Sequence, residues 1–315
     1  MFPIIQKSAY HSTKAARVKF RAQLINNRYL YLLALPGMCY FILFHYVPMW
    51  GMTLAFQEYN AFLGFFESEW VGFDQFKRLF DHPDFWNIFR NTIAISLLNV
   101  VFFFPAPIIL ALMLNEVRAT FYKKSIQTVL YLPHFVSWVV ICSITISLLN
   151  SDGAITSLLS RFGFHDQLLM DKFYFWGIIT IQSIWKDAGW GTIIFLAALT
   201  GINPELYEAS RVDGANRWKQ LLHITLPGIM GTIVILLILR LGQIMTLSFD
   251  QLYIMGNPIV KDVAEIFDTY VYTTGVLQGN FSFATAVGLF KSVVGFILIM
   301  SVNYIARKTS ENALF

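Results

Sequence analysis

The chain has 315 residues, of which 56% are hydrophobic and only 13% carry a formal charge. A soluble domain averages about 25% charged residues, so this composition excludes an ordinary soluble protein and indicates a polytopic membrane protein. The net charge of +4 does not indicate nucleic-acid binding, because the basic residues follow membrane topology, as counted below. The two cysteines, Cys39 and Cys142, lie inside apolar runs and lack the spacing of a metal site or a disulfide framework.

The N-terminal 28 residues carry six basic residues and no acidic one. The apolar run that follows, about 29–50, has the roughly 20 residues that a bilayer-spanning helix needs. No small-residue cleavage site follows this run, so we interpret it as an uncleaved first span and not as a signal peptide. Residues 1–28 are predicted to form a cytoplasmic amphipathic segment along the membrane surface.

Five further apolar runs predict an all-α membrane protein with six transmembrane helices. They cover about residues 86–114, 126–149, 173–200, 224–249 and 281–306. Pro105 and Pro107 interrupt the second run and predict a kink near Phe104, because proline removes a helix hydrogen bond. Residues 57–85 mix polar and aromatic residues, among them Trp70 and several Phe, which is typical of an interfacial segment on the outer side.

The distribution of Lys and Arg orients these helices. If both termini are inside, the inner segments are 1–28, 115–125, 201–223 and 307–315, and the outer segments are 57–85, 150–172 and 250–280. The inner segments then carry 14 of the 23 basic residues and the outer segments five. Basic residues are enriched in cytoplasmic segments, so the count predicts N-in and C-in. The six-helix domain is then residues 29–306, followed by a cytoplasmic tail at 307–315.

The most polar interval between two apolar runs is residues 207–228, YEASRVDGANRWKQLLHITLPG. We expect two short amphipathic helices here with a tight turn at Asp213 and Gly214, because glycine after aspartate marks a break. The apolar faces of the two helices would carry Leu206, Ala209 and Val212, and Trp218, Leu221 and Leu222. Two such helices at a membrane surface indicate a docking element for another protein.

This interval resembles the EAA motif of bacterial ABC-importer permeases. The matching positions are Glu208, Ala209, Ser210, Gly214, Ile224, Leu226 and Pro227. Ser210 is the one departure, since the family usually has alanine there. Asp213 and Ala215 around Gly214 resemble the form of the binding-protein-dependent (type I) sugar family. Leu35-Pro36-Gly37, Tyr131-Leu132-Pro133 and residues 281–286 extend the resemblance, and the nearest pattern is that of permeases for complex oligosaccharides such as aldouronates.

The resemblance implies a permease subunit of an ATP-driven importer in the bacterial cytoplasmic membrane. Residues from about 201 to 223 would form a coupling helix that seats in a cytoplasmic ATPase subunit. Two such ATPases would use ATP and Mg²⁺, and this chain would bind no cofactor. A second homologous permease would complete a heterodimer in the lipid bilayer, and an extracellular solute-binding protein would deliver the oligosaccharide.

The residues themselves agree with a protein that is not an enzyme. There is no catalytic constellation and no glycine-rich phosphate loop ending in Gly-Lys-Ser or Gly-Lys-Thr, so ATP hydrolysis would come from partners. The six histidines are scattered without ligand spacing, and no metal site is expected.

Polar side chains inside the apolar runs are the candidates for the substrate pathway, because such groups usually face a bundle interior or a wet cavity. They are Arg240, Gln243 and Asp250 in the fifth run, Gln182, Trp185 and Lys186 in the fourth, and Lys291 in the sixth. The spacing predicts that the fifth-run residues share one helical face with Leu247. Lys186 and Asp187 could instead belong to an interface network with the second permease, and Trp138 is interpreted as a packing or interfacial residue.

Two alternatives stay open. An ABC permease for a non-sugar solute, such as a peptide, would share the motif, although the sugar-type positions around Gly214 weigh against it. A secondary transporter would be expected to show inverted repeats with broken helices, and the sequence shows none.

Overall fold

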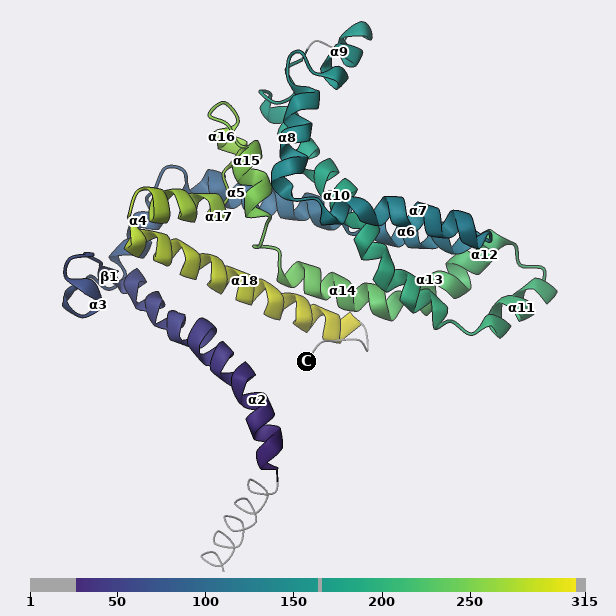
Figure 1. The fold of residues 1–315 in the computed structure, drawn as a ribbon, viewed down its shortest axis with the longest axis horizontal. Helices are drawn as coiled ribbons and strands as arrows, with labels where there is room; N and C mark the ends of the chain where they lie inside the picture. The colour runs from purple at the N-terminus through teal and green to yellow at the C-terminus, as the bar shows by residue number, and fades with distance from the viewer. Residues whose placement is uncertain (1–26, 164–165, 310–315) are drawn as a thin grey trace, which may run out of the picture. The chain divides into compact units, whose positions relative to one another are not determined.

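The computed structural model describes residues 27–163 and 166–309, with side chains described as far as Tyr304 (Figure 1). The chain divides into two compact units, Met1–Thr53 and Leu54–Phe315. Nearly all of the predicted cytoplasmic segment 1–28 lies outside the described residues, and so does most of the predicted tail at 307–315.

The described part of the first unit is helical throughout. α2 (Arg28–Phe41) passes into a π-helical turn, η1 (Ile42–Tyr46), and then into a 3-10 helix, η2 (Val47–Phe56). The whole run is long and apolar enough to cross a membrane. A helix is therefore present where the first span was predicted.

A small outer element opens the second unit. β1 (Gln57–Glu58) and β2 (Glu69–Trp70) form a two-stranded antiparallel sheet in which Gln57 faces Trp70. The short helices α3 (Gly64–Glu67) and α4 (Asp74–Phe80) flank it. These two-residue strands leave the fold all-α in character.

The second predicted span is one uninterrupted helical run of 32 residues, Phe85–Glu116. It consists of α5 (Phe85–Leu98), a π-helical turn, η3 (Asn99–Phe103), and α6 (Pro105–Glu116). Pro105 directly follows the π-helical turn and removes one hydrogen bond from the run. In this turn the Phe104 N–H donates to the Asn99 carbonyl at 3.0 Å. The kink predicted near Phe104 stays a prediction.

The third predicted span is wrong as a single helix. The predicted run begins inside α7 (Thr120–Tyr131) and continues through a 3-10 turn, η4 (Leu132–Phe135), into α8 (Trp138–Leu149). A further short helix, α9 (Ala154–Arg161), follows. Pro133 cannot continue the helix, and Ser137 starts a new one by accepting a hydrogen bond from the Val140 N–H. The break gives α8 a direction independent of α7.

The fourth predicted run forms a 29-residue helix, α10 (Lys172–Thr200), which packs against α5, α6, α7 and α14. Two glycines allow this close packing. A Cβ at Gly189 would overlap the Leu130 carbonyl of α7, and one at Gly191 would lie 2.9 Å from Pro107 of α6. The two glycines therefore allow α10 to lie close to α7 and α6.

The motif segment and the fifth run follow α10. They comprise α11 (Pro204–Val212), α12 (Arg217–Gln220), the π-helical turn η5 (Leu221–Thr225), α13 (Leu226–Gly228) and α14 (Met230–Gly242). The helix bends by 58° between Gly228 and Met230. The prediction that this span continues to residue 249 is wrong, because Gly242 ends α14 and polar residues at 243, 246 and 248 form a turn.

The remaining elements are α15 (Phe249–Met255), α16 (Lys261–Ala264), α17 (Phe267–Val271), the π-helical turn η6 (Tyr272–Leu277) and α18 (Phe281–Thr309). α18 packs against α4, α14, α17 and η6. It confirms a helix at the sixth predicted span, and Phe281–Tyr304 is apolar enough to cross a membrane.

Six spans were predicted, and the described residues contain four helices that are long and apolar enough, or five if the bent α12–α14 run counts as one. α10 has the length but not the apolarity, because its buried face carries Gln182, Ser183 and Lys186. A helix enclosed by other helices can carry such groups, whereas a lipid-facing helix cannot. Hydropathy alone therefore undercounts a bundle with a polar interior.

Segments predicted to share one side of the membrane contact one another. On the predicted outer side, Lys172 forms an ion pair with Asp262, and the Tyr59 N–H donates to the Ser282 hydroxyl at 2.8 Å. On the predicted inner side, Arg217 lies 3.1 Å from the carboxylate of Glu116.

Candidate functional site

The motif segment folds as two capped helices. Asn203 caps α11 and Asn216 caps α12, each by accepting a hydrogen bond from a backbone N–H in the first turn, at 3.0 and 2.9 Å. Between the helices, Gly214 has a φ of +77°, a conformation that a Cβ would strain. The predicted pair of short helices with a turn beside Asp213 is confirmed.

Side-chain hydrogen bonds fix α11 against α12 and η5. Gln220 Nε2 donates to Ser210 Oγ at 2.9 Å, and the hydroxyls of Tyr207 and Thr225 lie 2.9 Å apart. Ser210 Oγ also donates to the Tyr207 carbonyl at 2.9 Å. Ser210 is the position that departs from the resemblance, and an alanine there would make neither bond. The serine therefore gives this chain an additional tie between the two helices.

Apolar side chains of the two helices are uncovered. Leu206 and Val212 on α11 are 52% and 88% exposed, and Trp218 on α12 is 67% exposed. Glu208 and Ala209 are exposed beside them. Large apolar side chains gathered on one short exposed element are typical of a protein-interaction surface.

The last motif positions lead from this segment into the membrane helix. Ile224 lies in η5, and Leu226 and Pro227 lie in α13. Pro227 lies near the end of the continuous helical run Arg217–Gly228, where it removes one helix hydrogen bond. The bend at residue 229 follows directly.

A cavity of about 130 Å³ lies between α10, the π-helical turn η3 and the turn after α14. We call it the polar cavity. Its polar lining is Asn99, Ser183, Asp187, Arg240, Thr246, Ser248 and Gln251, and its apolar lining is Ile95, Phe103, Trp138, Ile179, Leu247 and Leu252.

Arg240 supplies the positive charge of the polar cavity. Its guanidinium lies 5.0 Å from the centroid of the Phe103 ring, a cation–π contact that leaves its N–H groups available. Among the described residues, none accepts a hydrogen bond from it. The side-chain oxygen of Asn99 is likewise buried without a partner in this part of the chain. Open donors and an open acceptor around one hollow suit a polar ligand.

Gln251 closes one side of the polar cavity, and the sequence did not point to it. It is 2% exposed, and its amide nitrogen donates to the Ile179 carbonyl at 2.9 Å and to the Gln182 side-chain oxygen at 3.0 Å. Ser183 donates to its oxygen at 3.3 Å. Gln251 lies on α15, beyond the unrecognised end of α14, so helical spacing could not relate it to Arg240.

Lys186 and Asp187 contact the residues at the break between α7 and α8. The Lys186 ammonium donates to the carbonyls of His134 and Val136 at 2.8 and 2.6 Å, and a carboxylate oxygen of Asp187 lies 2.8 Å from His134 Nδ1. The His134 ring stacks on Trp190 at 4.5 Å. Carbonyls at a helix end lack intrahelical partners, so the buried ammonium satisfies them. This geometry favours a structural role for Lys186, whereas Asp187 also lines the polar cavity.

The prediction of one helical face on the fifth run is wrong. α14 ends at Gly242, so Gln243, Leu247 and Asp250 do not continue the helix that carries Arg240. Leu247 reaches the polar cavity through the turn, but Gln243 and Asp250 are exposed and do not line it.

The remaining pathway candidates lie away from the polar cavity. Gln182 and Trp185 line a separate, mostly apolar groove of about 670 Å³ between α8, α9 and α10. Lys291 forms an ion pair with Asp268 between α18 and α17. Trp138, interpreted from sequence as a packing or interfacial residue, does pack against the buried apolar cluster, and it also lines the polar cavity.

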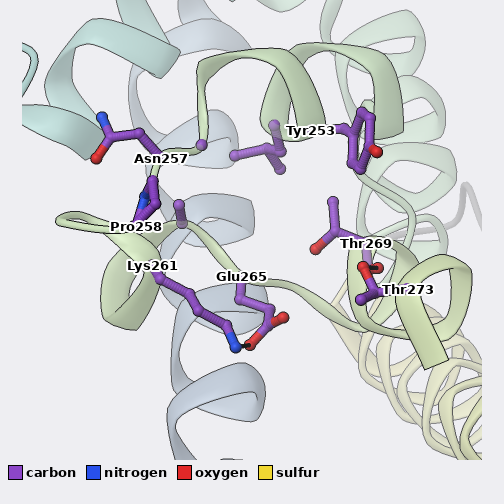
Figure 2. Close-up of a pocket in the computed structure, with 10 residues that line it drawn as sticks. Tyr253, Asn257, Pro258, Lys261, Glu265, Thr269 and Thr273 are labelled. Atoms are coloured by element: carbon purple, nitrogen blue, oxygen red, sulfur yellow. Dashed lines mark hydrogen bonds and ion pairs between the residues drawn. The ribbon is translucent and has the colours of Figure 1, made fainter. Parts of the chain in front are cut away.

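On the side predicted to face outward, a hollow of about 300 Å³ lies between α15, α16 and α17 (Figure 2). We call it the outer hollow. Tyr253, Thr269 and Thr273 stand on one side of it, and the ion pair of Lys261 with Glu265, at 3.6 Å, stands across from them. Burial raises the pKa of Glu265 above its usual range.

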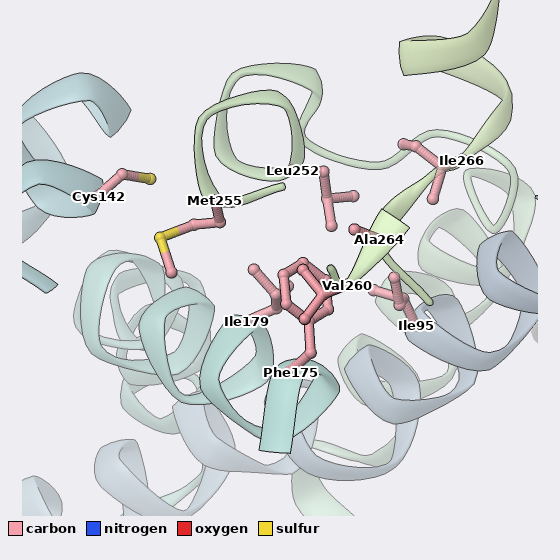
Figure 3. Close-up of a cluster of buried hydrophobic side chains, with 9 residues drawn as sticks. All are labelled: Ile95, Cys142, Phe175, Ile179, Leu252, Met255, Val260, Ala264 and Ile266. Atoms are coloured by element: carbon pink, nitrogen blue, oxygen red, sulfur yellow. The ribbon is translucent and has the colours of Figure 1, made fainter. Parts of the chain in front are cut away.

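Apolar side chains that line the outer hollow and the polar cavity belong to one buried cluster, whose members are drawn in Figure 3. The cluster consists of Ile95, Cys142, Phe175, Ile179, Leu252, Met255, Val260, Ala264 and Ile266, and we call it the outer seal. Leu252 lines both spaces, while Ile95 and Ile179 line only the polar cavity and Ala264 only the outer hollow. The two spaces are therefore lined in part by one buried cluster.

Sequence comparison gives similar proteins along nearly the whole chain. The family described as "Binding-protein-dependent transport system inner membrane component" matches residues 103–311. Protein LplB of Bacillus subtilis (strain 168) is 51% identical over 305 residues, which cover 96% of this chain and 96% of that protein. The polygalacturonan/rhamnogalacturonan transport system permease protein YteP of the same organism is 49% identical over 304 residues, covering 96% and 95%.

Two solved structures share the fold. A chain in the crystal structure of a bacterial alginate ABC transporter, in complex with an alginate pentasaccharide-bound periplasmic protein, has a TM-score of 0.86 at 36% identity and covers 93% of this chain and 99% of that chain. A second structure, of a bacterial ABC transporter involved in the import of the acidic polysaccharide alginate, gives 0.87 at 36% identity, with 93% and 100% coverage.

Proposed function

Because the chain belongs to the family of binding-protein-dependent transport system inner membrane components, as a permease subunit of an oligosaccharide ABC importer, we propose that it forms half of a translocation unit in the bacterial cytoplasmic membrane. The other half is a second homologous permease. Two cytoplasmic ATPase subunits bind and hydrolyse ATP with Mg²⁺, and an extracellular binding protein delivers the sugar. This chain binds no cofactor and carries out no chemical step.

The polar cavity is the part of this chain that holds the oligosaccharide during translocation. The observation that carries this proposal is Arg240, a cation that lines the cavity and whose N–H groups donate to none of the described residues. A guanidinium binds a carboxylate through two parallel hydrogen bonds. Trp138 offers an apolar surface to a sugar ring, and Asn99 offers an acceptor for a hydroxyl.

The charge of Arg240 favours an acidic oligosaccharide. YteP is named for polygalacturonan and rhamnogalacturonan, and one solved relative imports the acidic polysaccharide alginate. A neutral sugar offers no carboxylate to replace the water around a buried guanidinium. We therefore assign substrates that carry uronate carboxylates to this chain.

The size of the polar cavity supports a second permease. At about 130 Å³ it lies below the roughly 300–1,000 Å³ of ordinary ligand pockets. An oligosaccharide needs more surface than one subunit offers, so the facing wall comes from a homologous partner. Two different permeases place different side chains on the two walls.

The α11–α12 segment couples this chain to the ATPases. Its exposed apolar side chains Leu206, Val212 and Trp218 seat in an ATPase groove, with Glu208 at the rim. The Gln220–Ser210 hydrogen bond and the contact between the Tyr207 and Thr225 hydroxyls together help α11, α12 and η5 to move as a unit. When the ATPases close on ATP, this segment moves, the outer seal opens and sugar enters from the binding protein. ATP hydrolysis then returns the transporter to the state in which the cavity is open to the cytoplasm.

The proposal is tested by uptake in proteoliposomes that contain the assembled transporter, its binding protein and internal ATP. Arg240→Gln should reduce uptake of an oligogalacturonate at least tenfold, and Arg240→Lys should retain part of it. Arg161→Gln, on the predicted outer side, is the control and should transport normally. Normal oligogalacturonate uptake by Arg240→Gln would show that the path does not use this cavity.

A further inference from the structure

Three consecutive residues of α5 hold the loop that completes the outer seal. Asn91 is fully buried, and its amide nitrogen donates to the carbonyls of Asp262 and Glu265 at 2.9 and 3.0 Å. Arg90 donates to the same Asp262 carbonyl at 3.1 Å and to the Asn91 side-chain oxygen at 3.2 Å. Thr92 accepts a hydrogen bond from the Phe267 N–H at 3.3 Å. Residues 262–267 are thereby bound to one helix.

These bonds act on the seal itself. Ala264 and Ile266 belong to the outer seal and lie within the loop that Asn91 binds. Ile95, one helical turn after Asn91, belongs to the seal as well. Only residues 265 and 266 lie outside the short helices α16 and α17, and carbonyls at a helix end lack intrahelical partners. The carbonyls of Asp262 and Glu265 therefore depend on side-chain donors, and leaving them unpaired is costly.

The helix that carries Asn91 also reaches the motif segment. α5, η3 and α6 form the continuous run Phe85–Glu116, which at 1.5 Å per residue is about 48 Å long. At its inner end Glu116 pairs with Arg217 of α12 at 3.1 Å. One helix therefore joins the seal to the segment that the ATPases are proposed to move.

We propose that Asn91 is a positioning residue that latches the outer seal shut, and that the Phe85–Glu116 run carries the movement of α11–α12 to this latch. The inference rests on the proposed path through the polar cavity. Releasing the two carbonyls from Asn91 weakens the hold of α5 on residues 262–267, which favours parting of the seal and joins the outer hollow to the polar cavity.

The test measures access to the polar cavity from outside. The two native cysteines are removed by Cys39→Ser and Cys142→Ala, and Ser248→Cys in the polar cavity is the reporter. The assembled transporter is placed in right-side-out proteoliposomes and labelled with a membrane-impermeant maleimide. The parent should label slowly without nucleotide and quickly in the ATP-bound state. Asn91→Ala should raise the nucleotide-free rate about tenfold, since two hydrogen bonds that favour the closed state are lost. The difference between the two states should then nearly vanish.

The matched control is Asn280→Ala, which removes an asparagine that accepts a hydrogen bond from the Phe283 N–H on the same side. It should leave both rates unchanged. Labelling of Asn91→Ala at the parent rate, or an equal rise in Asn280→Ala, would overturn the latch. If Asn91→Ala does not assemble, Thr92→Val replaces it and should raise the nucleotide-free rate by a smaller factor, and no rise would overturn the proposal.

The nucleotide-free arm needs neither uptake nor ATP. If ATP does not change the labelling rate of the parent transporter, that result counts against the proposed function. The effect of Asn91→Ala on the nucleotide-free labelling rate can still be measured.

Discussion

A carboxylate oxygen of Asp187 lies 2.8 Å from Nδ1 of His134, so one acidic group joins the break between α7 and α8 to the polar cavity. The neighbouring Lys186 satisfies two carbonyls of the same break. Asp187 is therefore held in place from outside the cavity, and it is the one acidic side chain among the cavity-lining residues.

Asp187 should weaken the binding of acidic sugars, because a fixed carboxylate repels another in a low-dielectric space. Asp187→Asn keeps the shape and a hydrogen-bonding group for His134 but removes the charge. We expect the KM for ATP-dependent uptake of an oligogalacturonate to fall about twofold to tenfold, with kcat little changed. Asp171→Asn, which alters the cap of α10 on the predicted outer side, is the control. An unchanged or higher KM for Asp187→Asn would contradict the proposed charge of the site.

Gly189 and Gly177 offer a paired test of the packing of α10. A Cβ at Gly189 would overlap the Leu130 carbonyl, whereas a Cβ at Gly177 meets no atom within 4 Å. Overpacking costs about 1–3 kcal/mol, and here the obstacle is backbone that cannot rotate away. Gly189→Ala should lower the thermal unfolding midpoint of the detergent-solubilised transporter by several degrees or prevent assembly. Gly177→Ala should leave the midpoint unchanged or raise it, and equal losses would mean that α7 is not packed as described.

The turn at Gly214 should matter more to transport than Ser210. Gly214→Ala places a Cβ at a φ of +77°, which costs about 1 kcal/mol and tilts α12 against α11. We expect it to reduce ATP-dependent uptake about tenfold or more without loss of membrane insertion. Ser210→Ala removes two partly exposed hydrogen bonds and should retain most uptake. Gly163→Ala supplies a control with similar backbone strain, at a φ of +85°, in a predicted outer loop. Normal uptake by Gly214→Ala would remove the coupling role from this turn.

The sequence was most informative where local chemistry decides structure. The glycine after Asp213 marked the turn between α11 and α12 without help from distant residues, and α18 follows from a long apolar run. Apolar composition was less informative, because it does not distinguish one long helix from a helix, a turn and a second helix. Pro133 and Gly242 each ended a helix inside an apolar run.

The polar cavity could be predicted only in part. Arg240 was identified because a charge inside an apolar run is costly. Asn99, Ser183 and Gln251 were missed, since each is a neutral polar residue that becomes significant only when three separate helices meet. Lys186 was placed in the pathway for its charge, but its hydrogen bonds lead to the break at His134. No sequence pattern relates those two positions.

Protection of a cavity residue by substrate tests the central claim most directly. In the assembled transporter with its binding protein, held in the ATP-bound state, Thr246→Cys should be labelled by a maleimide at a rate that a saturating oligogalacturonate lowers at least fivefold. A neutral maltooligosaccharide of equal length should give no protection, and Arg240→Gln should abolish the protection by oligogalacturonate. A labelling rate that oligogalacturonate leaves unchanged, or protection that persists in Arg240→Gln, would contradict passage of an acidic oligosaccharide beside Arg240.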